Sequence, residues 1–252
     1  MSRNLALIMT SIVLVGILGR VLELQKVKAS GTIYIRANGL VDPSTAPIQR
    51  DGNLYTFTGN LFDEIVIERD NILVDGAGYT VQGTGSGTGI ALSGRSNVAI
   101  KNMEIRAFTY GVLLTHSSSN SITGNEITNN TVGMKLEALS DNNNVYGNRI
   151  TNNIYGITLQ GSCSHNNVSR NKIEKNDIGI DLFGSCNYNN VSRNSIANNN
   201  YTGIVLYDSS NNYISENNIT TNAEGIKLDS SLNNSISNNN ITDNDYAGIL
   251  LW

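Results

Sequence analysis

Gly179-Ile-Asp-Leu182 is followed 24 residues later by Gly203-Ile-Val-Leu206, and the same Gly-apolar-x-Leu unit recurs from residue 89 to the end of the chain. The units begin at Gly89, Gly111, Gly133, Gly156, Gly179, Gly203, Gly225 and Gly248, with steps of 22, 22, 23, 23, 24, 22 and 23 residues. A fixed period of this size is typical of a solenoid, in which each repeat packs only against its neighbours.

Four apolar columns run through these repeats, and in one repeat they are Ile180, Leu182, Val191 and Ile196. The first two residues are two positions apart, which puts both side chains on one face of a strand. The last two are five apart with polar residues between them, which suits two short strands separated by a corner. No repeat has the apolar spacing of an amphipathic helix. The pattern therefore predicts short strands and turns throughout.

Asparagine recurs in three further columns, represented in one repeat by Asn189, Asn194 and Asn199. Asparagine is poor within strands but tolerates the left-handed backbone conformation of a tight corner. Stacked side-chain amides can also hydrogen-bond from one turn to the next. We therefore predict an all-β, single-stranded parallel β-helix of about 22–24 residues per turn, with asparagine ladders at its corners.

The chain divides into three predicted segments. Residues 1–29 combine Arg3, an apolar run and Val27-Lys28-Ala29, which is typical either of a cleaved export signal or of an uncleaved membrane anchor. Residues 30–84 are expected to form an N-terminal cap and a first irregular turn, and residues 85–252 the regular repeats. Because Trp252 directly follows a predicted strand, we expect the natural protein to continue beyond it.

Composition limits the partners. The chain is 39% hydrophobic and 15% charged, and its net charge of -4 argues against a nucleic-acid surface, which would need a basic stripe. Any contact with a membrane is expected only through an uncleaved N-terminal segment. The predicted location is extracellular or at the cell surface.

The unit Gly-Ile-x-Leu … Asn-x-Val-x-x-Asn-x-Ile-x-x-Asn resembles the parallel β-helix repeat of NosD-like proteins, within the wider group of carbohydrate-binding and sugar-hydrolase β-helices. The resemblance covers residues 89–252, while Thr32–Arg36, Ala46–Gly52 and Val74–Gly78 resemble the start of secreted archaeal members. It implies a right-handed helix, as does the general preference of parallel crossovers. The repeat is specific for this fold, but the fold hosts many functions.

The resemblance also suggests copper, which binds His, Cys or Met side chains. In this sequence only Cys163-x-His165 together with Cys186 could form a cluster, because His116 stands apart and the methionines lie in the targeting segment, in an apolar column or alone. We predict no metal site and no cofactor.

Cys163 and Cys186 occupy matching Gly-Ser-Cys segments one repeat apart. Adjacent turns are about 4.8 Å apart, which permits a disulfide, and export would favour one. The alternative is a stacked pair of reduced thiols that act as small apolar residues.

Catalytic motifs of acidic-sugar enzymes are not found: the sequence lacks Gly-His-Gly, Asp-Asp, Asp-His and Asp-Pro-His. The sequence thus favours a non-catalytic polysaccharide-binding or structural module and gives no catalytic residue. A polysaccharide lyase, hydrolase or epimerase is the alternative, and a NosD-like copper accessory role is a weaker one.

The Gly-x-x-Leu strands direct alternate residues outward, as the pairs Lys135/Glu137, Thr158/Gln160 and Asp181/Phe183 illustrate. Aromatic rings and carboxylates together suit sugar rings and their hydroxyl groups. We therefore predict a shallow saccharide-binding face made of Asp181, Phe183, Tyr207, Asp208 and Asp229. The alternative is that these are isolated surface residues, because single exposed aromatics are common.

Overall fold

The computed structural model describes residues 31–252, so the predicted targeting segment 1–29 lies outside the described residues. Within 31–252 the regular structure consists of strands alone, as the repeat pattern predicts. No helix in this part of the chain is long and apolar enough to cross a membrane.

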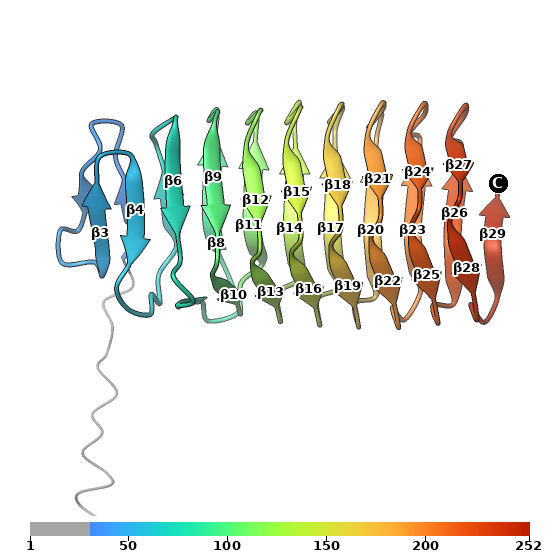
Figure 1. Ribbon diagram of the computed structural model, residues 1–252, viewed down its shortest axis with the longest axis horizontal. Helices are drawn as coiled ribbons and strands as arrows, with labels where there is room; N and C mark the ends of the chain where they lie inside the picture. Colours follow the sequence, from blue (N-terminus) through green and yellow to red (C-terminus); the bar gives the residue numbers. More distant parts are fainter. Residues whose placement is uncertain (1–30) are drawn as a thin grey trace, which may run out of the picture. The chain divides into compact units, whose positions relative to one another are not determined.

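The strands form three sheets that run along the solenoid, with successive turns side by side (Figure 1). Sheet A contains, in spatial order, β2 (Val41–Asp42), β1 (Ile33–Ile35), β5 (Ile65–Ile67), β8 (Thr88–Ser93), β11 (Tyr110–Thr115), β14 (Val132–Glu137), β17 (Tyr155–Gln160), β20 (Ile178–Phe183), β23 (Thr202–Tyr207), β26 (Glu224–Asp229) and β29 (Ala247–Leu251). Its regular strands carry the Gly-apolar-x-Leu units.

The other two sheets are built from shorter strands. Sheet B contains β3 (Ile48–Asp51), β4 (Leu54–Phe57), β6 (Ile72–Asp75), β9 (Val98–Lys101), β12 (Ser121–Thr123), β15 (Asn144–Tyr146), β18 (Asn167–Ser169), β21 (Asn190–Ser192), β24 (Tyr213–Ser215) and β27 (Ser235–Ser237). Sheet C contains β7 (Thr80–Gln82), β10 (Glu104–Arg106), β13 (Glu126–Thr128), β16 (Arg149–Thr151), β19 (Lys172–Glu174), β22 (Ser195–Ala197), β25 (Asn218–Thr220) and β28 (Asn240–Thr242).

Strand pairing is parallel throughout the regular repeats. Each strand pairs with the equivalent strand of the next turn, in register, so that Ile157 lies beside Ile180 and Val168 beside Val191. In the described residues antiparallel pairs join only β1 to β2 and β3 to β4, both near the N-terminal end. The chain is thus a parallel β-solenoid with an irregular beginning.

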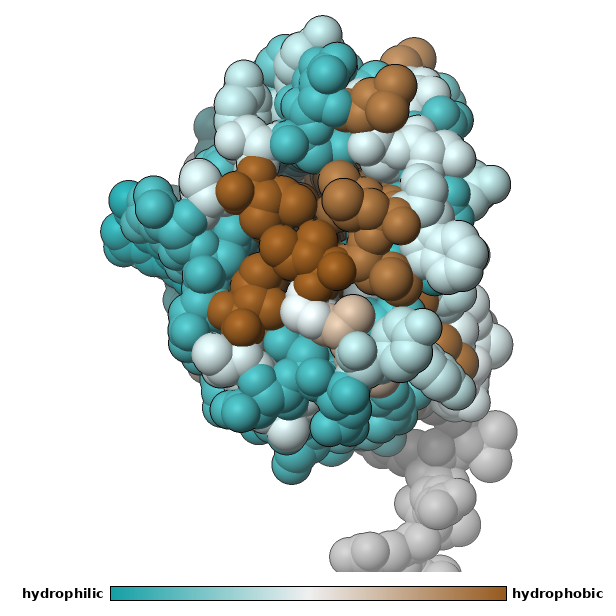
Figure 2. Space-filling view, turned by 90° about the vertical axis from the view of Figure 1, so that its right-hand side faces the viewer, coloured by the Kyte–Doolittle hydropathy of each residue, from teal (hydrophilic) through white to brown (hydrophobic). Residues whose placement is uncertain are grey.

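The predicted apolar columns fill the interior. Ile180, Leu182, Val191 and Ile196 are fully buried, and the same holds for their counterparts in the neighbouring turns. Figure 2 looks along the solenoid from the side of β29 and shows apolar residues at the centre with hydrophilic residues around them. Burial of these columns is the main favourable term in the free energy of folding.

The three asparagine columns form buried ladders at the corners. Asn171 is typical: its Oδ1 accepts hydrogen bonds from the backbone N–H and the side-chain amide of Asn148, each at 3.0 Å. Its Nδ2 donates to the carbonyl oxygen of Val145 at 2.9 Å and to Oδ1 of Asn194 at 3.0 Å. Because both ends of the side chain are used, the amide can be buried without loss of hydrogen bonding.

The glycine of each unit from Gly89 to Gly225 is required by close packing. A Cβ atom on Gly156 would lie 2.4 Å from the carbonyl oxygen of Gly179 and 3.1 Å from Cγ2 of Ile173. From β8 to β26 the glycine and the apolar residue after it are both buried in each strand of sheet A, which interrupts the normal in-out alternation. The residue before the glycine consequently faces outward.

Candidate functional site

Three rows of side chains cover the outer face of sheet A. In the middle row Lys135, Thr158 and Asp181 follow one another on adjacent strands. On one side the row is flanked by Gln160 and Phe183, in register on β17 and β20. The other flank is formed by residues that precede the repeat glycines, Tyr110, Val132 and Tyr155.

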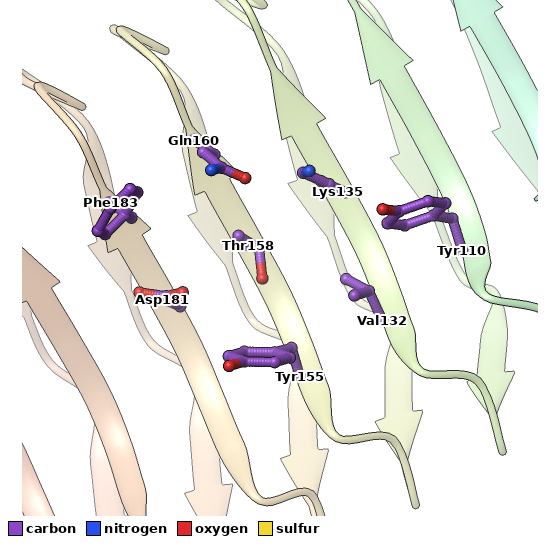
Figure 3. A pocket seen from close by; sticks show the side chains of 8 residues that line it. All are labelled: Tyr110, Val132, Lys135, Tyr155, Thr158, Gln160, Asp181 and Phe183. Carbon is purple, nitrogen blue, oxygen red and sulfur yellow. The ribbon is translucent and has the colours of Figure 1, made fainter.

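These side chains line an open groove of about 320 Å³. Figure 3 shows Thr158 between Lys135 and Asp181, with Tyr155 and Val132 on one side and Gln160 and Phe183 on the other. We call the eight lining residues the groove: Tyr110, Val132, Lys135, Tyr155, Thr158, Gln160, Asp181 and Phe183. A concave site with aromatic walls and a few polar groups on its floor is a typical ligand-binding arrangement.

Thr158 carries the least satisfied polar group of the groove. Its side chain is 93% buried, since only 7% of the residue is exposed. Its Oγ1 has no hydrogen-bond partner within residues 31–252. An unpaired buried hydroxyl costs about 1–3 kcal/mol. A ligand hydroxyl or a water molecule at this point would replace the hydrogen bond to solvent that the hydroxyl loses on folding.

Asp181 lies next to Thr158 along the floor. Its burial raises the pKa of the carboxyl group to about 6. Both the protonated and the ionised form are therefore accessible near neutral pH, and the side chain can donate as well as accept a hydrogen bond. Titration in this range is the property expected of a proton-transfer group, although structural carboxyl groups share it.

Lys135 supplies the positive charge of the groove, and it is held in place. Its Nζ lies 2.8 Å from Oε2 of Glu137 and 5.4 Å from the centre of the Tyr110 ring. Burial raises the pKa of Glu137, but the hydrogen bond and charge of Lys135 and a hydrogen bond from Thr115 more than offset this and lower it. Glu137 thus stays ionised, so much of the lysine charge is already balanced.

Phe183 and Tyr207 form an exposed aromatic pair at one edge of the groove. Their ring centres are 5.2 Å apart with an interplanar angle of 19°, and they are 42% and 45% exposed. The stacking follows from the register that places β20 beside β23. Together the two rings offer a flat apolar surface that is wider than a single ring.

The five predicted saccharide-binding residues do not all lie at the groove. Asp181 and Phe183 line the groove, and Tyr207 stacks on Phe183. Asp208 follows β23 in a left-handed conformation with φ 48, and Asp229 accepts a hydrogen bond from Ser230 at 3.0 Å. Neither of these two aspartates lines the groove. Binding by the five residues stays a prediction.

Sequence reasoning missed most of the groove. Lys135, Thr158 and Gln160 were expected to point outward but were not selected, and Tyr110 and Tyr155 were not expected to point outward. The available signal was a tyrosine directly before a repeat glycine, which occurs at Tyr110 and Tyr155 alone.

Cys163 and Cys186 are free thiols in the structure, both fully buried. Their Sγ atoms donate to the carbonyl oxygens of Gln160 and Phe183, at 3.3 and 3.4 Å. The neighbouring Cys163 and burial raise the pKa of Cys186, and the neighbouring Cys186 lowers that of Cys163. The structure thus has the stacked thiols, and a disulfide stays a prediction.

The described residues do not fit a copper site. Among residues 31–252 no three His, Cys, Asp or Glu side chains come together in a group that could hold a metal ion. His165 stacks on Tyr188 with ring centres 5.5 Å apart, whereas the sulfur atoms of Cys163 and Cys186 bond to carbonyl groups in the interior. The sulfur atoms of Cys163 and Cys186 are therefore already engaged in the fold.

Comparison with protein families gives two matches. Residues 41–202 match the family described as periplasmic copper-binding protein (NosD), and residues 177–252 match the right handed beta helix region. Comparison with curated proteins gives no significant sequence match.

Solved structures with a similar fold include β-helix enzymes and an adhesin. The periplasmic alginate epimerase AlgG has a TM-score of 0.52 at 12% identity, covering 83% of this chain and 84% of the enzyme. A mutant of AlgG gives 0.53 at 16% identity, and there 70% of this chain spans about half, 51%, of the matched chain. The Streptococcus pneumoniae surface protein and adhesin PfbA gives 0.49 at 15% identity, covering 78% and 68%. Identities this low establish the fold and nothing about activity.

Proposed function

The chain belongs to the NosD family, and from the outer face of sheet A we propose that it is an exported saccharide-binding β-helix. The groove binds one or more sugar units of a polysaccharide, with rings against the aromatic side chains and hydroxyl groups against the polar floor. Export is supported by the family, whose description is periplasmic.

The unpartnered hydroxyl of Thr158 carries this proposal. It lies between Lys135 and Asp181 on the groove floor, where a sugar hydroxyl can both donate to and accept from the surrounding groups. A ligand hydroxyl at this position would give Thr158 Oγ1 a hydrogen-bond partner, which favours hydroxyl-rich ligands.

The stacked pair Phe183 and Tyr207 supports the same ligand class. Sugar rings carry apolar C–H faces, and an aromatic plane at a groove edge offers these faces a matching surface. The 320 Å³ volume and open shape suit a few units of a linear polymer better than an enclosed small molecule.

A second candidate function is acid–base processing of the bound polysaccharide, favoured by one observation. Asp181 has a pKa raised to about 6, so it can take up and release a proton near neutral pH. In this reading Asp181 exchanges a proton with the sugar while Lys135 and Thr158 hold the sugar's polar substituents. Non-catalytic binding remains the first proposal, because a single titrating carboxyl group with a balanced lysine does not define a reaction.

The test is binding of the purified protein to immobilised alginate, polygalacturonate and cellulose, compared with two variants. We expect Thr158→Val and the double variant Phe183→Ala/Tyr207→Ala each to weaken binding about tenfold, since a lost hydrogen bond or ring contact is worth about 1–1.5 kcal/mol. Tyr213→Ala is the matched control, because Tyr213 is 56% exposed on sheet B, away from the groove.

The same samples separate binding from catalysis. New reducing ends, unsaturated sugars or inverted uronate centres that disappear in Asp181→Asn would select the enzyme. Unchanged polysaccharide with groove-dependent binding would select the binding module. Equal binding by wild type and both groove variants, with intact circular dichroism spectra, would overturn the proposal.

A further inference from the structure

We propose that sheet A carries a second saccharide subsite whose middle strand lies four turns from the middle strand of the first, so that a linear polysaccharide lies along the solenoid axis and contacts both. This inference rests on the proposed function and extends it to the length and direction of the ligand. It is carried by a side-chain arrangement that occurs twice on the same face.

The first copy lies in the groove. Tyr110 and Tyr155 are in register two turns apart, with the smaller Val132 between them (Figure 3). Two turns correspond to about 10 Å, so the side chain of Val132 leaves a space between two tyrosines that is about one turn wide. We call Tyr110, Val132 and Tyr155 the first slot. Lys135, on the middle strand β14, stands beside it with its Nζ 5.4 Å from the Tyr110 ring centre.

The second copy lines a separate cavity of about 420 Å³. Tyr201 and Tyr246 stand two turns apart with Ala223 between them, aligned by backbone bonds from Glu224 to Tyr201 and from Tyr246 to Ala223, each 2.8 Å. We call Tyr201, Ala223 and Tyr246 the second slot. Its tyrosines are 63% and 72% exposed.

Polar groups accompany the second slot as they do the first. Lys227 lines the cavity on the middle strand β26, in the same outward row as Thr158 and Asp181. Glu224 lines it too and accepts a hydrogen bond from Thr202 at 2.9 Å. The second slot thus combines two rings, a small residue, a lysine and a carboxylate, as the groove does. Tyr201 and Tyr246 each stand one residue before a strand of sheet A, whereas the tyrosines of the first slot are the first residues of their strands. The second slot is therefore displaced by one residue along the chain relative to the first.

The spacing between the copies selects the ligand. The middle strands β14 and β26 are four turns apart in sheet A, which corresponds to about 19 Å along the axis. Between them the same outward row holds Thr158, Asp181 and Val205. A disaccharide reaches one slot only, whereas a decasaccharide reaches both. Linked contacts of this kind strengthen binding through effective concentration.

The experiment compares disaccharides and decasaccharides of alginate, polygalacturonate and cellulose by calorimetry. The decasaccharide of the bound polymer should bind at least about tenfold more tightly than its disaccharide. Tyr155→Ala and Tyr246→Ala should each remove most of this gain, while Tyr213→Ala leaves it unchanged. All three variants should keep the wild-type melting temperature within a few degrees, because Tyr213 and Tyr246 are exposed and Tyr155 is only partly buried.

The outcomes distinguish this inference from the proposed function. Decasaccharide binding that falls in Tyr155→Ala but not in Tyr246→Ala would overturn the second subsite and leave the groove intact. Equal affinity for both lengths would also overturn it. Absence of binding to every probe would overturn the proposed function and the second subsite together.

Discussion

The corners of the solenoid and the outer face of sheet A follow opposite rules. At the corners the same side chain returns in every regular turn: Asn125, Asn148, Asn171 and Asn194 occupy one column, all buried and bonded to one another. On the outer face the equivalent positions read Lys135, Thr158, Asp181 and Val205 in successive turns. Repetition marks positions that the fold needs, whereas variation marks positions that are available for binding.

The physical reason lies in what each side chain satisfies. A ladder asparagine completes the hydrogen bonds of its neighbours, so every turn must supply the same group. An outward residue of sheet A has no such obligation, and Thr158 even keeps a buried hydroxyl unpaired. Three substitutions test this contrast, beginning with the largest expected effect.

Asn171→Ala should lower the free energy of unfolding by about 3–5 kcal/mol, because it leaves several buried groups without partners at about 1–3 kcal/mol each. These include the N–H of Asn148 and the carbonyl oxygen of Val145. Thr158→Val, with a similar shape, should change stability by less than about 1 kcal/mol, since it removes a hydroxyl that has no partner. Urea denaturation followed by circular dichroism gives both values, and equal losses would contradict the contrast.

Gly156→Ala should cost about 3 kcal/mol, since the new methyl group meets a backbone oxygen that cannot move without disturbing the next turn. Gly147 provides the matched control: it has φ +65, and nothing lies within 4 Å of an added Cβ. Gly147→Ala should cost only about 1 kcal/mol, from the strained left-handed backbone. Melting temperatures measured at one heating rate would rank the two variants. A larger loss in Gly147→Ala than in Gly156→Ala would show that close packing does not explain the glycine of the repeat.

Asp181→Asn should have the smallest effect and the opposite sign. Because burial raises the pKa of Asp181 to about 6, ionisation disfavours the folded state, and the wild type loses stability as the pH rises from about 4 through about 6. The asparagine variant escapes this loss, so it should be more stable than wild type by about 2–3 kcal/mol above pH 7 and nearly equal at pH 4. Asp208→Asn, at an exposed position outside the groove, is the matched control. A pH-independent difference for Asp181→Asn would contradict burial as the cause.

The fold could be predicted because the residues that determine it recur at the same position of each repeat. Each apolar column recurs in every regular turn, as do those of Ile180, Leu182, Val191 and Ile196. A wrong assignment of the spacing in one turn would therefore disagree with all the others. The buried asparagine ladders were predictable for the same reason. A single turn would have revealed neither feature, since short apolar runs fit strands and helices alike.

The groove was less predictable because it depends on departures from the repeat. Simple alternation from Val112 places Tyr110 inside, but Gly111 and Val112 are both buried and Tyr110 faces outward. The interruption comes from the close approach of glycine to the next turn, which the sequence does not state. The burial of Thr158 likewise depends on its neighbours Tyr155 and Asp181 rather than on its own position in the repeat.

The asparagine ladders also give the solenoid an electric dipole along its axis. In every ladder the side-chain amide of one turn donates to the Oδ1 of the next turn toward the C-terminal end, as Asn148 does to Asn171 and Asn171 to Asn194. Aligned amide dipoles add rather than cancel, and chains of hydrogen bonds polarise one another. Three such columns therefore run as parallel dipoles with their positive ends toward β29. A polysaccharide also has two unlike ends, so a charged chain on sheet A would meet a field that distinguishes its two orientations.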